Sequence, residues 1–136
     1  MTNQRQASKA WHIALWIIQL LLATGFIWAA CMKLMQPIEK LSAMWPWTGQ
    51  VNSALVKGTA IVDLLIGLGL ILPTSLRIRP GLSIVAAIAA VILMVCAGIF
   101  HIARGEAAVI AVNIIFALLA VLVAWGRYKK APIGAK

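Results

Sequence analysis

The sequence predicts an all-α membrane protein, a bundle of four transmembrane helices with a short interfacial helix or lid between the first and second. Hydrophobic residues make up 63% of the 136 residues and charged residues only 11%, whereas a soluble domain carries about 25% charged residues. The apolar residues fall into four runs, about 11–32, 55–72, 80–102 and 107–125, each near the roughly 20 residues that cross a bilayer. We therefore predict a single polytopic membrane domain over residues 1–136.

The connection between the first and second runs, residues 34–54, is the long one. Pro37 suits the first turn of a helix, and Glu39 follows where the helix dipole favours an acid. Trp45-Pro46-Trp47 then ends that helix and places two indoles where membrane–water interfaces favour them. A short helix on the membrane surface, or a lid dipping into it, fits this pattern, and a plain anchoring loop fits it equally well.

The other connections are short. The second helix is expected to end at Pro73, and Pro80 can begin the third after a brief turn. Residues 100–106 form a polar hinge between the third and fourth runs, and the fourth is expected to end at Gly126. These short turns make successive helices antiparallel neighbours.

The net charge of +9 does not indicate nucleic-acid binding, because the basic residues lie at the ends of the apolar runs. Anionic lipid headgroups and membrane topology explain that placement better. The two tails and the turn at 74–79 carry eight Lys and Arg residues, and the connection 33–57 with the hinge carries four. The positive-inside rule then places both termini in the cytoplasm and the hinge outside.

Each run also carries small or polar residues at heptad spacing, the pattern by which membrane helices pack closely. We expect these stripes to face the bundle interior. They are Gln19, Ala23, Phe26, Ala30 and Lys33; Thr59, Asp63 and Gly67; Ser83, Ala87, Ala90, Met94, Ala97 and His101; and Asn113, Ala117, Ala120 and Ala124. Cys31 and Cys96 are interpreted as small buried apolar residues, and any redox role for them stays open.

Asp63 is the strongest indication of a site, because an unpaired carboxylate within a membrane span costs about 2.5 kcal/mol or more and such residues usually mark function. Lys33 and Asn113 are its candidate partners. With the hinge outside, Lys33 and His101 lie at outer helix ends, and Asn113 lies roughly 9 Å in from the outer end of its helix. The four residues are expected to form an outward-facing polar pocket.

The rim of this pocket would be formed by residues of the hinge and of the long connection. Glu106 could pair with His101 or Arg104, or occupy the first turn of the fourth helix. The predicted ligand-binding or proton-handling set is Lys33, Asp63, His101, Glu106 and Asn113, and Trp45, Trp47 and Arg104 are expected at the pocket mouth.

A purely structural polar clasp between the helices is the alternative to a ligand or proton site. The sequence shows no nucleotide loop, no Ser/His/Asp set and no metal-spaced cluster, so we predict no catalytic or metal residues. A haem held by His12 and His101 is excluded, because these would lie at opposite membrane faces, about 30 Å apart. Whether the protein is an enzyme stays open.

Several of these segments resemble the DoxX-like family of small bacterial membrane proteins. The resemblance lies in Ala30-Cys31-Met32-Lys33-Leu34, Met44-Trp45-Pro46-Trp47, Asp63 to Pro73, and Phe100-His101-x-x-Arg104-Gly105-Glu106 followed by Asn113 and Trp125-Gly126-Arg127. It runs from about residue 11 to 127. The family pattern usually has glutamate where this chain has Asp63.

The resemblance implies four helices in the bacterial inner membrane and a link to quinone or thiol redox chemistry. Three functions remain open. The protein could be an accessory subunit of a membrane redox complex, with quinone as the implied cofactor and a redox protein or a second copy as partner. It could instead be a stand-alone binding or transport module for a small apolar molecule. It could also be a purely structural membrane protein.

Overall fold

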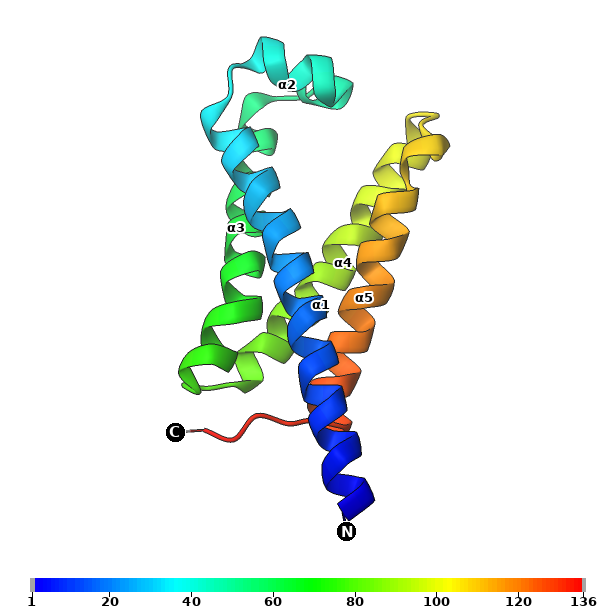
Figure 1. Ribbon diagram of the computed structural model, residues 1–136. Helices are drawn as coiled ribbons and strands as arrows, with labels where there is room; N and C mark the ends of the chain where they lie inside the picture. The colour runs from blue at the N-terminus through cyan, green and yellow to red at the C-terminus, as the bar shows by residue number, and fades with distance from the viewer. Residues whose placement is uncertain (1, 136) are drawn as a thin grey trace.

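The computed structural model describes residues 2–135. Across these residues it contains only helices: α1 (Thr2–Met35), α2 (Ile38–Met44), α3 (Ser53–Leu76), α4 (Gly81–Ala103) and α5 (Ala111–Lys129), with the 3₁₀ helices η1 (Pro46–Gly49) and η2 (Ala107–Val109) in the connections (Figure 1). Helices α1, α3, α4 and α5 are each long and apolar enough to cross a membrane. The predicted four-helix membrane bundle is confirmed.

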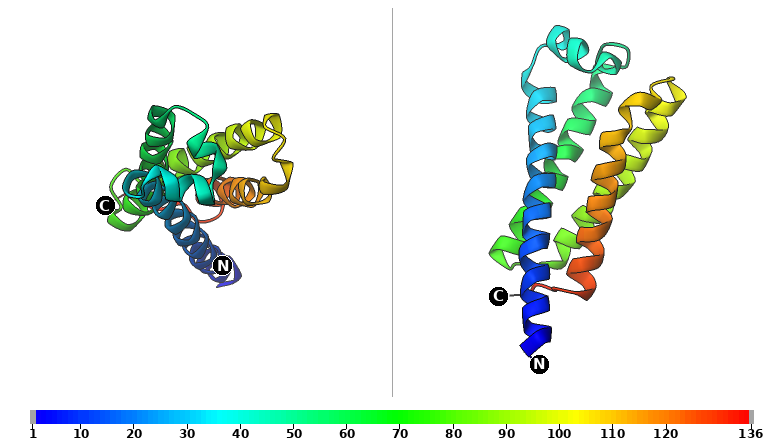
Figure 2. Two further views of the ribbon diagram at one scale, coloured as in Figure 1. Left: turned by 90° about the horizontal axis from the view of Figure 1, so that it is seen from above. Right: turned by 45° about the vertical axis from the view of Figure 1, so that its right-hand side comes forward.

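The bundle has two unlike ends. Both ends of the described chain lie at one of them, which we call the terminal end, and α2, η1 and η2 lie at the other, the cap end (Figure 1). Helix α1 packs mainly against α3, and α4 packs mainly against α5. The ribbons of these two pairs meet toward the terminal end and diverge toward the cap end in both side views (Figure 2).

Small residues explain where the pairs meet. On α4, Ser83, Ala87 and Ala90 are fully buried, whereas Met94 and His101 are only half-buried. Small side chains let helix backbones approach closely, and the buried core lies where they occur: Leu22, Ala23, Phe26, Ile66, Leu70, Ala86, Ala87, Ala90, Ala120 and Val123. The predicted stripes of α4 and α5 therefore face the interior most fully in the terminal half, whereas those of α1 and α3 stay buried as far as Lys33 and Asp63.

The outward faces carry large apolar side chains. Leu21, Leu65 and Leu118 are each more than 60% exposed in the isolated chain, as expected of side chains that contact lipid. Cys31 and Cys96 are also exposed and unbridged, so the expectation that they are buried is wrong. Each directly neighbours a stripe residue, Ala30 or Ala97, and one residue turns a helix by about 100°, which carries the thiol out of the interior.

Two predicted helix ends are also wrong. Helix α3 continues past Pro73 to Leu76, because its last turn is held from outside by hydrogen bonds of Thr74 to other helices. Helix α5 begins at Ala111 and runs through Gly126 to Lys129. A Cβ at Gly126 would lie 2.7 Å from Leu15, so this glycine serves close packing against α1 and does not end the helix.

Candidate functional site

The cap half of the α1–α3 pair is joined by a buried ion pair. Lys33 Nζ donates to Asp63 Oδ2 at 2.8 Å and to Thr59 Oγ1 at 3.2 Å. The two charged side chains are only 11% and 5% exposed. Lys57 Nζ covers the end of α1 by donating to the carbonyl of Lys33 at 2.8 Å. Of the two partners considered for Asp63, the structure pairs it with Lys33.

Trp47 in η1 contacts both helix pairs. Lys33 Nζ lies 5.5 Å from its ring centroid, a distance at which a cation and an indole attract each other. The same ring also packs edge-on against Phe100 of α4, with centroids 5.8 Å apart. Trp45 packs instead against Trp28 on α1, at 5.7 Å. The structure therefore places Trp47, and not Trp45, between the two pairs.

The hinge after α4 forms a small charged cluster. Arg104 donates through Nε to Glu106 and through Nη2 to Gln50, next to η1. Gly105 between them has a φ of 75°, a conformation that glycine adopts without steric cost. Because Arg104 donates this hydrogen bond to its carboxylate, the pKa of Glu106 lies below its ordinary value. Arg104 thus links the hinge to Gln50 at the end of η1.

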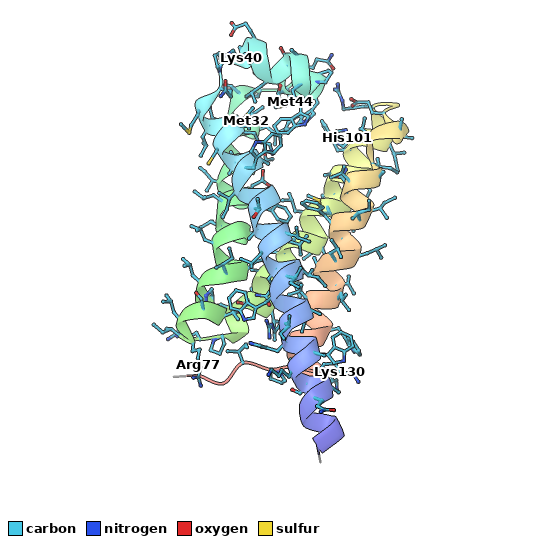
Figure 3. The ribbon with its side chains drawn as sticks, in the orientation of Figure 1. Met32, Lys40, Met44, Arg77, His101 and Lys130 are labelled. Atoms are coloured by element: carbon cyan, nitrogen blue, oxygen red, sulfur yellow. The ribbon has the colours of Figure 1, made fainter. Side chains whose placement is uncertain are left out.

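His101 and Asn113 each present a buried polar atom. Figure 3 shows His101 at the cap end of α4. Among the described residues, His101 Nδ1 and Asn113 Nδ2 have no hydrogen-bond partner, and the nearest anion to His101 Nδ1 is Glu106 Oε1, 3.6 Å away. Such atoms normally find a partner in proteins, so both are candidates for contact with a bound molecule.

The five predicted site residues form two groups. Lys33 and Asp63 belong to the α1–α3 pair, whereas His101, Glu106 and Asn113 belong to the α4–α5 pair and its hinge. Within the described chain no hydrogen bond or ion pair joins the groups, and Trp47 lies between them. Asn113 is also shallower than expected: because residues 107–109 form η2, it lies roughly 3 Å from the start of α5, not 9 Å.

A second polar cluster, at the terminal end, was missed by the sequence analysis. Gln19 is fully buried in α1; its amide nitrogen donates to the carbonyl of Leu70 and to Thr74 Oγ1, and its oxygen accepts from Arg127 Nε at 2.6 Å. Thr74 Oγ1 and Ser83 Oγ share a hydrogen bond at 2.6 Å. One network thus joins all four long helices.

The sequence held partial signals of this cluster. Gln19 and Ser83 lay on the predicted interior stripes, but Arg127 was grouped with the basic tail. Arg127 is in fact 3% exposed, and its Nη1 contacts His12 Nδ1 at 3.0 Å and the carbonyl of Ala131 at 3.1 Å. The sequence predicts that the last helix ends at Gly126, which would leave Arg127 outside it and exposed. Because α5 continues to Lys129, Arg127 lies on the helix and is buried.

Four apolar helices of membrane-crossing length define this chain as a multi-pass integral membrane protein. A sequence profile of the DoxX-like family matches residues 17–123, well over half of the 136 residues, and the chain belongs to the DoxX-like family. The match includes all five predicted site residues and stops before Arg127. No curated protein and no solved structure matches the chain. Within residues 2–135, no group of three or more His, Cys, Asp or Glu side chains could hold a metal ion.

Proposed function

We propose that this DoxX-like protein holds a small membrane-soluble molecule of the quinone type at its cap end, as an accessory subunit of a quinone- or thiol-linked membrane redox system. The observation that carries the proposal is the buried, unpartnered state of His101 Nδ1 and Asn113 Nδ2 among the described residues. Leaving a buried polar group unpaired costs roughly 1–3 kcal/mol. A molecule that accepts hydrogen bonds from them would recover that cost.

The chemistry of a quinone suits these side chains. Its two carbonyl oxygens accept hydrogen bonds, which the Asn113 amide and the Nδ1-protonated tautomer of His101 can donate. Its flat apolar ring suits Trp47 and Phe100, which already pack edge-on at 5.8 Å. Both polar atoms are covered in this structure, so binding requires their side chains to rotate or the helix pairs to part.

A bound quinone would supply two-electron redox chemistry, and the chain would supply position and protons. Asn113 and His101 would orient the carbonyl groups from the α4–α5 pair. Asp63 is the buried carboxylate within the span, and Lys33 keeps it paired at 2.8 Å. Together these two side chains can hold a proton near the ring without leaving an isolated charge in the membrane.

One observation favours the alternative that the Lys33–Asp63 pair is a structural clasp. Lys33 already bonds to both Asp63 and Thr59, so the pair is satisfied without a ligand. A third function, binding or transport of a different small apolar molecule, would use the same cap-end side chains.

The decisive experiment is purification of the tagged full-length chain in mild detergent, followed by solvent extraction and quinone measurement. We expect quinone with the wild-type protein and with Ile114→Leu, a substitution at the neighbouring, 51% exposed position. Asn113→Leu keeps side-chain size but removes the donor, and should reduce bound quinone up to about tenfold. Absence of quinone together with a different apolar molecule would support the third function.

A second variant separates the redox role from the clasp. Asp63→Asn keeps the size and most hydrogen bonding of the side chain but removes its charge. Because Lys33 lies in the last turn of α1, its ammonium can reach the membrane surface once the carboxylate charge is gone. We therefore expect unchanged expression and a nearly unchanged melting temperature, with loss of the bound molecule and of any co-purifying redox protein. A large fall in melting temperature with binding retained would support the clasp.

We further propose that the protein lies in the bacterial inner membrane with the terminal end in the cytoplasm. Support comes from the eight Lys and Arg residues of the tails and the α3–α4 turn, against four in the other connections. In a Cys31→Ser, Cys96→Ser background, Ala43→Cys should be labelled from outside the cell and Ser75→Cys should not; both positions are exposed. The reverse pattern would refute the orientation.

A further inference from the structure

Arg127 is a buried cation at the terminal end that no acidic side chain neutralises. It is 3% exposed, and its contacts are to the amide oxygen of Gln19, the ring of His12 and the carbonyl of Ala131. Its Nη2 is buried and has no partner among the described residues. Guanidinium groups so deeply buried normally pair with an anion.

The chain has no acidic side chain to offer there. Its three acids are Glu39, Asp63 and Glu106; Glu39 and Glu106 lie in the connections of the cap end, and Asp63 is paired with Lys33 in the cap half. The terminal end carries further cations, among them Arg77 and Lys130 (Figure 3). No acidic side chain among the described residues therefore neutralises Arg127, so an anion from outside the chain can take that role.

A hollow of about 150 Å³ lies beside Arg127 and the first turn of α4. It is lined at the start of α4 by Pro80, Gly81 and Ile84, from α5 by Arg127 and Tyr128, and from the C-terminal tail by Pro132 and Ile133. A Cβ at Gly81 would meet nothing within 4 Å, so this turn is open. In the first turn of this 23-residue helix, Leu82 and Ser83 already donate to the carbonyls of Arg79 and Pro80. The Gly81 N–H and the positive end of the helix dipole remain to favour phosphate.

We infer that this hollow binds a phosphate group, held between the guanidinium of Arg127 and the N-terminus of α4. A guanidinium fork matches phosphate oxygens in geometry as well as charge. The phosphate can belong to a lipid headgroup, because Arg127 lies near the end of a membrane-spanning helix, or to a soluble phosphate. The site is at the opposite end of the bundle from the proposed quinone site and does not depend on it.

The test measures the melting temperature of the full-length protein in an uncharged detergent. Inorganic phosphate is compared with sodium chloride at equal ionic strength, and phosphatidylglycerol with diacylglycerol, which lacks the phosphate. Gly81→Leu fills the hollow while keeping Arg127 and its network. Gly98→Leu is the matched control, because Gly98 lies on the same helix and its Cβ also meets nothing within 4 Å.

We expect one of the two phosphate sources to raise the melting temperature by roughly 5 °C at saturation, in the wild type and in Gly98→Leu. Gly81→Leu should weaken the apparent affinity about tenfold or more, as should Arg127→Gln if it folds. A response to phosphatidylglycerol alone identifies a lipid headgroup, and a response to inorganic phosphate identifies a soluble ligand. A full response in Gly81→Leu, or equal responses to phosphate and chloride and to both lipids, would overturn the inference.

Discussion

The two ends of the bundle solve the problem of buried polar groups in different ways. At the terminal end, neutral groups of all four long helices meet around Arg127, and Gln19 alone bonds to three partners. At the cap end, charges are paired within a helix pair or its hinge, as in Lys33–Asp63 and Arg104–Glu106. The terminal end is thus the joint that holds the two pairs together, whereas at the cap end they meet through Trp47 and Phe100 and through Arg104 and Gln50.

The side chains on α4 account for this difference. Toward the terminal end its interior face carries Ser83, Ala87 and Ala90, which let α3 approach closely. Toward the cap end the same face carries the larger side chains of Met94 and His101, with Ala97 between them, and all three are only partly buried. Phe26 and Phe116, whose rings meet edge-on at 5.6 Å, lie between the terminal half and the cap half. The spacing of small residues therefore decides where the four helices act as one unit.

The largest expected effect comes from removing the centre of the terminal network. Gln19→Leu has nearly the same volume but deprives Arg127 of its closest acceptor and Thr74 of a donor. Because a charged group then stays buried with fewer partners, we expect a loss of about 3 kcal/mol of stability, measured by thermal or denaturant unfolding in detergent. Gln36→Leu is the control, since the structure gives the Gln36 side chain no hydrogen bond among residues 2–135.

If Gln19→Leu and Gln36→Leu unfold alike, the terminal end is not the joint that the hydrogen bonds indicate. The difference between the terminal end and the cap end would then be a difference in helix packing alone.

A pair of glycine substitutions tests the packing difference directly. A Cβ at Gly69 in the terminal half would lie 2.8 Å from the Cβ of Ala86 on α4. Alanine has no rotamer by which to move away, so the backbones must separate, and Gly69→Ala should cost about 2 kcal/mol. Gly98 lies in the cap half of α4 in open space, and Gly98→Ala should stabilise the helix by about 0.5–1 kcal/mol.

Opposite signs for these two alanine variants would confirm that close helix packing is confined to the terminal half. A cost at both positions would mean that the pairs also close at the cap end in the membrane.

A smaller effect is expected at the contact that joins the pairs at the cap end. Trp47→Leu removes the ring that contacts both Lys33 and Phe100 and should cost about 1 kcal/mol. Faster hydrogen exchange should follow in η1 and at the end of α4, measured by mass spectrometry. Trp45→Leu is the control, because Trp45 packs only on the α1 side, against Trp28. Equal changes in both variants would mean that Trp47 does not link the two helix pairs at the cap end.

The same contrast explains what could be predicted from the sequence. The four spans and their interior faces follow from local patterns, because run length and heptad spacing of small residues act within one helix. The partners of Arg127 could not be predicted, since Gln19 is 108 positions away and the burial depends on where α1 crosses α5. The predicted depth of Asn113 is wrong because the apolar residues after the hinge form the 3₁₀ helix η2. Hydropathy does not distinguish such a turn from the start of a membrane span.

The separation of Lys33 and Asp63 from His101 and Asn113 was equally beyond the sequence. Each residue lies on its expected face, but the divergence of the two helix pairs is a property of the packed bundle. Trp47 was named with Trp45 because both flank Pro46, and only the three-dimensional path of η1 tells them apart.

The smallest expected effect concerns acid and the hinge. Because Arg104 lowers the pKa of Glu106 in the folded protein, the carboxylate stabilises the fold above the pKa of an unfolded glutamate, about 4.3. This contribution is lost progressively as the pH falls from there through the lower folded pKa. Glu106→Gln should therefore melt below the wild type at pH 6, with the difference shrinking toward pH 3.

Glu39→Gln supplies the control, because exposed Glu39 has no ion-pair partner among the described residues and its variant should show a pH-independent difference. The titration of Asp63 is common to the wild type and both variants, so it cancels in each comparison. Since the hinge is partly exposed, salt should also shrink the Glu106 effect, whereas salt should leave the buried terminal network nearly unchanged. A Glu106→Gln difference that persists unchanged at pH 3 would mean that hydrogen bonding, and not charge, ties the hinge to the cap.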